Sequence, residues 1–65
     1  MKPTYLTNIR TKRKRLKLTQ RDMAERLCMN LLAYQRLEWG VTALTVYRLI
    51  KIADVLNIKV KELLP

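Results

Sequence analysis

The sequence of 65 residues contains no histidine and only one cysteine, one glycine and two prolines. Structural zinc sites are built mainly from cysteine and histidine, so we expect no metal and no cofactor. The lone glycine, Gly40, cannot form the glycine-rich loop with which many enzymes hold phosphates. The five acidic residues have no base or nucleophile pattern beside them, so the sequence predicts no enzymatic activity.

The single cysteine, Cys28, has no second cysteine in the sequence with which to form a disulfide. Disulfide frameworks are typical of small secreted domains, so we expect a cytoplasmic protein. The basic N-terminus lacks the apolar stretch of roughly 7 to 15 residues that a signal peptide needs. The sequence also lacks a run of about 18 apolar residues, so we expect no membrane partner.

Apolar residues make up 49% of the sequence. This content is high enough to offset the chain entropy lost on folding, so we predict a folded protein rather than a disordered one. A chain this short buries only about 60% of the surface that its unfolded form exposes. We therefore expect residues 1–65 to form one domain with a small core.

Acidic residues are scarce, and the net charge is +9. Residues 1–21 contain eight of the fourteen lysines and arginines and no acidic residue. A positive field this concentrated attracts polyanions, of which nucleic acid is the most common and an anionic membrane the next. The alternative is a solvated basic face that only aids solubility.

Apolar residues recur at helical spacing almost throughout the chain, which predicts an all-α fold. The expected helices cover residues 5–17, 20–27, 31–39 and 46–56, and a last turn covers residues 60–64. Thr19, Asn30 and Thr45 are residue types that commonly cap a helix start, and Gly40 is typical of a left-handed helix end. Only two residues lie between the second helix and the Asn30 cap, so the second and third helices must turn sharply.

The apolar positions of the expected helices define a predicted core. Its members are Leu6, Ile9, Leu16, Met23, Ala24, Leu27, Val46, Leu49, Ile50, Ala53, Leu56, Leu63 and Leu64. The other positions of the first helix are largely lysine and arginine, so this helix is amphipathic and turns a basic side toward solvent or a partner.

Three short motifs lie at fixed separations in the sequence. They are Leu18-Thr19-Gln20, Leu37-Glu38 before Gly40, and Ile52-Ala53 before Leu56. Through these motifs, the stretch from Ile9 to Leu64 resembles the phage-repressor-like helix-turn-helix family, also called the XRE family. Each motif is weak alone, but their joint spacing without a gap is specific.

This resemblance implies both a fold and a function. The fold would be a lambda-repressor-like, compact bundle of about five short helices, and the chain would bind double-stranded DNA as a sequence-specific transcriptional regulator. The third helix would enter the major groove while the second lies across the backbone. Such proteins usually bind palindromic operators as homodimers. Arg13 and Glu38 would form an ion pair between the first helix and the end of the third.

The resemblance also places Gln20 on a DNA phosphate, next to Thr19. For both residues the alternative is capping of the second helix alone. The further candidates for phosphate contacts are Arg10, Lys14, Arg21 and Thr42. Contacts of this kind fix the position of a protein on the duplex but carry little sequence information.

The exposed early positions of the third helix are the candidates for contacts with base edges. They are Leu31, Leu32, Gln35 and Arg36. The family commonly has polar residues where the two leucines stand, because polar side chains can form paired hydrogen bonds with bases. Three interpretations stay open. The leucines touch thymine methyl groups while Gln35 and Arg36 bind adenine or guanine, they form an apolar patch with Trp39, or they belong to the core.

The apolar patch would lead to a different function, a protein-interaction module such as an antitoxin or the partner of another regulator. A third function, nonspecific architectural binding to DNA, would need only the basic residues.

Cys28 also departs from the family, because glycine commonly occupies the tight turn at this position. A positive φ at Cys28 would cost on the order of 1 kcal/mol. The loop Val41–Leu44 is less basic than is usual, which weakens the expectation of phosphate contacts there. Tyr34 and Leu37 occupy positions of the third helix that the family buries.

Overall fold

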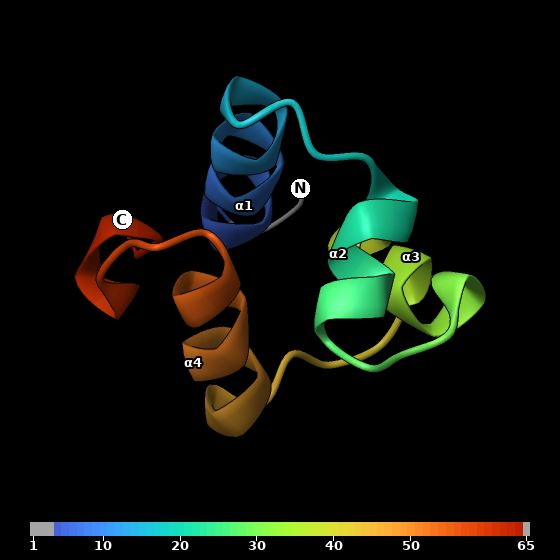
Figure 1. The fold of residues 1–65 in the computed structure, drawn as a ribbon. Coiled ribbons are helices and arrows are strands. Elements are labelled where there is room, and N and C mark those ends of the chain that lie inside the picture. The colour runs from blue at the N-terminus through green and yellow to red at the C-terminus, as the bar shows by residue number, and fades with distance from the viewer. Residues whose placement is uncertain (1–3, 65) are drawn as a thin grey trace.

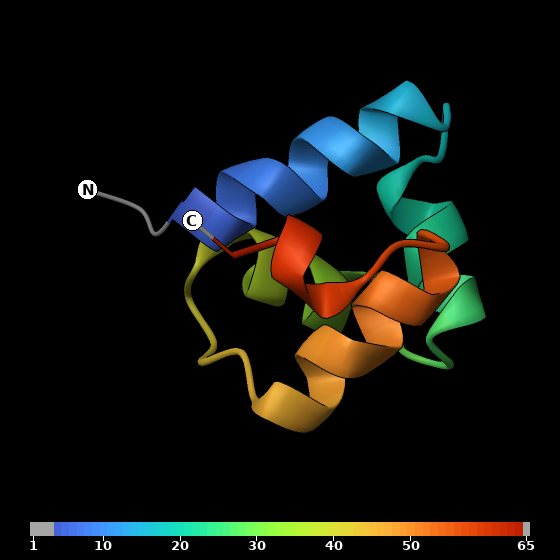
Figure 2. The ribbon, with the colours of Figure 1, turned by 90° about the vertical axis from the view of Figure 1, so that its left-hand side faces the viewer.

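The computed structural model describes residues 4–64. These residues form four α-helices and one 3₁₀ turn: α1 (Thr4–Arg15), α2 (Gln20–Arg26), α3 (Leu31–Trp39), α4 (Val46–Val55) and η1 (Val60–Glu62). Figure 1 shows α2 and α3 together on one side of the molecule and α4 with η1 on the other, and Figure 2 shows α1 lying across them. The all-α prediction is confirmed, and the bundle of about five helices is four α-helices with a terminal 3₁₀ turn.

The helix starts are fixed by the predicted capping residues. The Thr19 hydroxyl accepts a bond from the Asp22 amide at 3.0 Å, and the Asp22 carboxylate accepts one from the Thr19 amide at 2.8 Å. This reciprocal capping box lowers the pKa of Asp22, chiefly through the bond from the Thr19 backbone. Asn30 and Thr45 each accept a bond from the third amide of their helix, at 2.8 and 3.1 Å. All three N-cap predictions are confirmed.

One or two residues after the end of each α-helix stands a residue with a left-handed backbone. These residues are Lys17, Cys28, Gly40 and Asn57, with φ values of 60°, 56°, 81° and 57°. After α2, the Met29 amide donates to the Ala24 carbonyl at 2.9 Å, and the Cys28 amide donates to the Glu25 carbonyl at 3.1 Å. This bond pair lets the chain reverse at once toward α3. The positive φ considered for Cys28 is therefore present, at a position where a side chain is strained.

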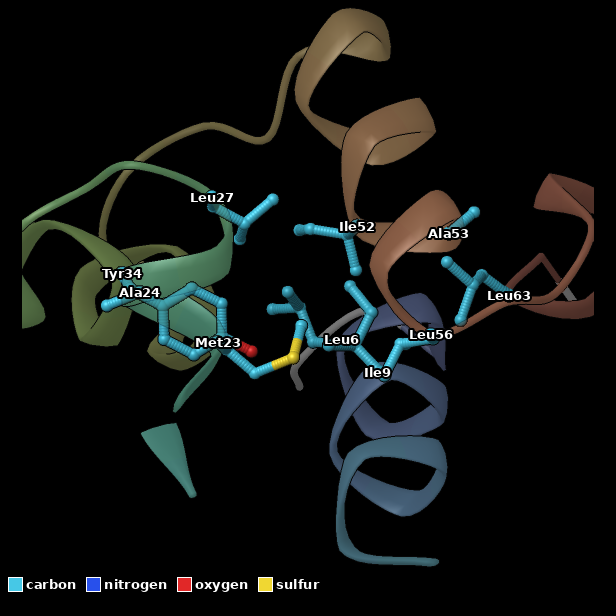
Figure 3. Packing of buried hydrophobic residues seen from close by; sticks show 10 residues of the cluster. All are labelled: Leu6, Ile9, Met23, Ala24, Leu27, Tyr34, Ile52, Ala53, Leu56 and Leu63. Carbon is cyan, nitrogen blue, oxygen red and sulfur yellow. The ribbon is translucent and has the colours of Figure 1, made fainter. Parts of the chain in front are cut away.

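The buried side chains of α1, α2, α3, α4 and the residue after η1 meet in one cluster (Figure 3). Its members are Leu6, Ile9, Met23, Ala24, Leu27, Tyr34, Ile52, Ala53, Leu56 and Leu63. Met23, Tyr34 and Leu63 have no exposed surface. The predicted interior positions of α2 and the predicted burial of Tyr34 and Leu37 are thus confirmed.

The predicted apolar stripe of α4 is partly wrong. Val46 is 74% exposed and Ile50 is 44% exposed, while Ile52 is 1% exposed. The buried face of α4 contains Ile52 and Ala53 and continues to Leu56, directly after the helix. Leu56 is four positions from Ile52 and three from Ala53, so the three residues share one side. Both stripes fit a helical period, and only packing against α1 and α2 selects the one that faces inward.

Two further core predictions are wrong for a local reason. Leu16 is 51% exposed, because α1 ends at Arg15 and the left-handed Lys17 turns the chain away from the face of Leu6 and Ile9. Leu64 is 45% exposed, since Leu63 already fills the position against the core.

A hydrogen bond connects the residue after η1 to α1. The Asn8 side-chain amide in α1 donates to the Leu63 carbonyl at 2.8 Å, which holds the turn after η1 against α1. The longest helix of the described residues, α1, has 12 residues. None of the helices in this part of the chain has the length and apolarity to span a bilayer.

Candidate nucleic-acid interface

The ion pair expected between Arg13 and Glu38 lies in the interior, where it joins α1 to α3. Arg13 Nη2 and Nε donate to the two oxygens of the Glu38 carboxylate at 2.8 and 3.0 Å. A third donor of the same guanidinium, Nη1, binds the Leu18 carbonyl at 2.9 Å. Arg13 is 8% exposed and Glu38 is 2% exposed, so solvent screens this bidentate pair little.

The Glu38 carboxylate also accepts a bond from the Tyr34 hydroxyl, one turn earlier in α3. Burial alone would raise the pKa of Glu38, but the bonds from Arg13, Tyr34 and Gln20 together hold it below its ordinary value. The pKa of Tyr34 is raised, first by burial and then by its bond to Glu38. At neutral pH the site therefore consists of a carboxylate that accepts and three side chains that donate to it.

The hydrogen bonds continue from this buried pair to the surface of α3. Gln20, the first residue of α2, donates from Nε2 to Glu38 Oε1 at 3.3 Å. Gln35 in turn donates from its Nε2 to Gln20 Oε1 at 3.0 Å. We call the series Arg13, Glu38, Gln20 and Gln35 the amide relay. Only the pair of Arg13 and Glu38 was predicted from the sequence, because the bonded partners of the relay are 15 to 25 residues apart in the chain.

The chemistry of the amide relay fixes the direction of each bond. The carboxylate of Glu38 can only accept, so Gln20 must present its NH₂ group to it and its oxygen to the other side. Gln35 must then present its own NH₂ group to Gln20. This removes the usual ambiguity between the oxygen and nitrogen of an amide side chain. It leaves the oxygen and one N–H of Gln35 for a partner outside the relay.

The four candidate base-reading residues lie in the first two turns of α3. Arg36 is exposed, Leu32 is 50% exposed, and Leu31 and Gln35 are partly exposed. The interpretation of the two leucines as core residues therefore does not hold. Trp39 is 44% exposed, and it stands seven positions after Leu32 on the same side of the helix.

The candidate backbone-contacting residues differ in how free their side chains are. Lys14, Arg21, Thr19 and Thr42 are exposed. The hydroxyl oxygen of Thr19 already accepts the capping bond, but its proton can still be donated. Thr42 follows the end of α3, where its amide donates to the Arg36 carbonyl at 3.2 Å. Thr19 and Thr42 thus lie next to the two ends of the helix-turn-helix unit.

Arg10 and Gln20 already have partners within the protein. Arg10 is partly buried, and its Nη1 donates to the Glu38 carbonyl at 3.0 Å, so this side chain holds the end of α3 to α1. Gln20 is partly buried in the amide relay. Arg10 keeps further N–H groups and Gln20 keeps one N–H for a phosphate, but both have a structural role that capping and charge did not predict.

Comparison with known proteins gives one result. A family model described as helix-turn-helix matches residues 9–63, which is most of the chain. No curated protein and no solved structure matches the sequence significantly.

Proposed function

Because this chain belongs to the helix-turn-helix family, in its XRE-like form, we propose that it binds double-stranded DNA sequence-specifically as a small transcriptional regulator. In this proposal α3 enters the major groove and α2 lies across the backbone. The observation that carries it is the exposed start of α3, held rigidly on the body of the domain by the buried pair of Arg13 and Glu38. A net charge of +9 supports a polyanionic partner.

Gln35 and Arg36 would supply the hydrogen bonds to bases. The free oxygen and N–H of Gln35 match the amino group and N7 of adenine, which is the pairing that amide side chains commonly make. Arg36, exposed at the next position, would bind the two acceptors of guanine. Leu32, and to a lesser extent Leu31, would touch thymine methyl groups.

The phosphate contacts would come from residues on both sides of α3. They are Thr19, Gln20, Arg21, Arg10, Lys14 and Thr42. Three of these are cations, and each neutralised phosphate contributes about −0.9 to the slope of log affinity against log salt. We therefore expect a slope of about −3 for one domain.

We further propose that two copies bind together. Half-sites would then lie about 34 Å apart, one turn of the double helix. The expected cytoplasmic location belongs to the same proposal.

Selection from a random pool of DNA duplexes, followed by sequencing, tests this function. We expect one enriched motif, with the symmetry and spacing of two half-sites. Arg36→Ala should weaken binding and relax the preference at one base position, at a cost of about 1–3 kcal/mol. Lys61→Ala removes an exposed charge from η1 and is the matched control. An unenriched pool, or equal effects of the two variants, would contradict sequence-specific binding through α3.

The exposure of Leu32 and Trp39 on one side of α3 supports a second candidate, a protein-interaction module. Replacing Leu31 and Leu32 with glutamine separates the two functions. Loss of a protein partner with DNA affinity kept or improved would support the interaction module. If the leucine double variant loses only DNA binding, the result would support the regulator. DNA affinity that does not change when Gln35 and Arg36 are replaced would indicate nonspecific DNA binding.

A further inference from the structure

A groove with a volume of about 380 Å³ opens between the end of α2 and the outer side of α4. It is lined by Arg26, Leu27, Cys28, Tyr47, Arg48, Lys51, Asp54 and Val55. Its volume falls within the range of small-molecule sites, which is roughly 300–1,000 Å³. None of its residues is among those considered above for contact with DNA.

The charges around this groove are unbalanced. Arg26, Arg48 and Lys51 line it together with one carboxylate, that of Asp54. Within residues 4–64 the salt bridge is that of Arg13 with Glu38, so the three cations of the groove have no carboxylate in direct contact. Bringing three like charges to one groove is unfavourable unless an anion joins them, because each repels the others.

The rest of the lining is suited to a flat organic group. Leu27 is 8% exposed and Val55 is partly buried, and both contribute apolar surface to the lining of the groove. Tyr47 is 64% exposed and lies beside the groove, with the Lys51 ammonium 5.5 Å from its ring centre. A ring on a ligand could pack on Tyr47 while its anionic group contacts the three cations.

We propose that this groove binds a small phosphate monoester whose organic part is a flat ring. Arginine and lysine together suit a phosphate dianion, since the guanidinium offers paired donors and the ammonium a compact charge. The ligand would connect the turn between α2 and α3 to α4 and would neutralise positive charge beside the helix-turn-helix unit.

Titration of ¹⁵N-labelled protein with adenosine 5′-monophosphate, adenosine and inorganic phosphate tests this site by NMR. The first probe has both the ring and the dianion, and each of the others has only one of them. We expect the monophosphate to bind at least ten times more tightly than either control. Its shifts should centre on residues 26–28 and 47–55.

Two double variants distinguish binding in the groove from a general attraction of the monophosphate to a positively charged protein. Arg48→Gln with Lys51→Gln should weaken binding of the monophosphate at least tenfold. Lys59→Gln with Lys61→Gln removes the same charge outside the groove and should leave binding within about twofold, as salt screens distant charges. Circular dichroism of both variants checks that they are folded.

Three results would overturn the site. One is equal binding of monophosphate and inorganic phosphate, and another is equal loss in both variant pairs. The third is a set of DNA-induced shifts centred on the same groove, which would assign these cations to the duplex backbone. If the protein binds DNA sequence-specifically but does not bind the monophosphate, the groove proposal is rejected and the regulator proposal is not. If it binds the monophosphate but shows no sequence-specific DNA binding, only the regulator proposal is rejected.

Discussion

The buried pair of Arg13 and Glu38 provides the most direct test of how this domain is held together. In Glu38→Ala, two guanidinium bonds, of 2.8 and 3.0 Å, and the acceptor of the Tyr34 hydroxyl disappear. Arg13 keeps its bond to the Leu18 carbonyl but becomes a buried charge without a counterion. Loss of one partner of a buried pair costs about 3–5 kcal/mol, against under about 1 kcal/mol for an exposed pair.

This loss is large for so small a domain. At about 0.05–0.15 kcal/mol per residue, a domain of this size has a total stability of roughly 3–10 kcal/mol, so Glu38→Ala should remove much of it. Urea unfolding at pH 7, followed by circular dichroism and by the fluorescence of Trp39, measures the change. A stabilising osmolyte in all samples keeps the variant folded enough to compare. Glu25→Ala, at an exposed position of α2, should change stability by less than about 0.5 kcal/mol.

A variant in which Arg13, Tyr34 and Glu38 are all replaced makes the test sharper. Arg13→Met, Tyr34→Phe and Glu38→Leu together leave no buried charge and no unpaired hydroxyl, so this triple variant should be more stable than Glu38→Ala alone. A cost for Glu38→Ala below about 1 kcal/mol would refute the claim that this pair is desolvated. So would a triple variant less stable than the single one.

Three further outcomes follow from the structure. The free energy of unfolding should fall as the pH drops from 5 toward 2, because folding lowers the pKa of Glu38. The stabilisation from Glu38 is complete above the unfolded pKa of about 4.3 and is lost as the carboxylate is protonated in the folded protein. The triple variant, which lacks Glu38, should show a flatter pH profile in the same unfolding assay. Cys28→Gly should raise stability by about 1 kcal/mol, or about 4–8 °C in Tm, because the left-handed backbone at this position strains a side chain. Asn57→Gly should raise stability by less, since asparagine tolerates this backbone conformation better. Gln20→Leu should release the Gln35 amide from its hydrogen bond. In the duplex selection, this variant should therefore relax the base preference at the same operator position as Gln35→Ala. If the two variants relaxed the preference at different operator positions, the result would argue against the amide relay.

The helix boundaries of this protein are largely a property of the sequence itself. Thr19, Asn30 and Thr45 cap their helices through bonds to amides three residues ahead, and Gly40 ends α3 through bonds to the preceding turn. Partners this close in the chain are brought together by the local helix itself, so the pairing does not depend on how the helices are arranged. For this reason the elements could be predicted to within about two residues at each boundary.

Tertiary structure decided which side of each helix is buried and how the polar side chains connect. Ile50 and Ile52 both fit an apolar stripe, and only the placement of α4 against α1 and α2 buries the second. Gln20 and Gln35 belong to different helices, and their bond exists because the start of α2 packs beside the middle of α3. Burial and long-range hydrogen bonds depend on the relative position of helices, which helical periodicity within one segment does not contain.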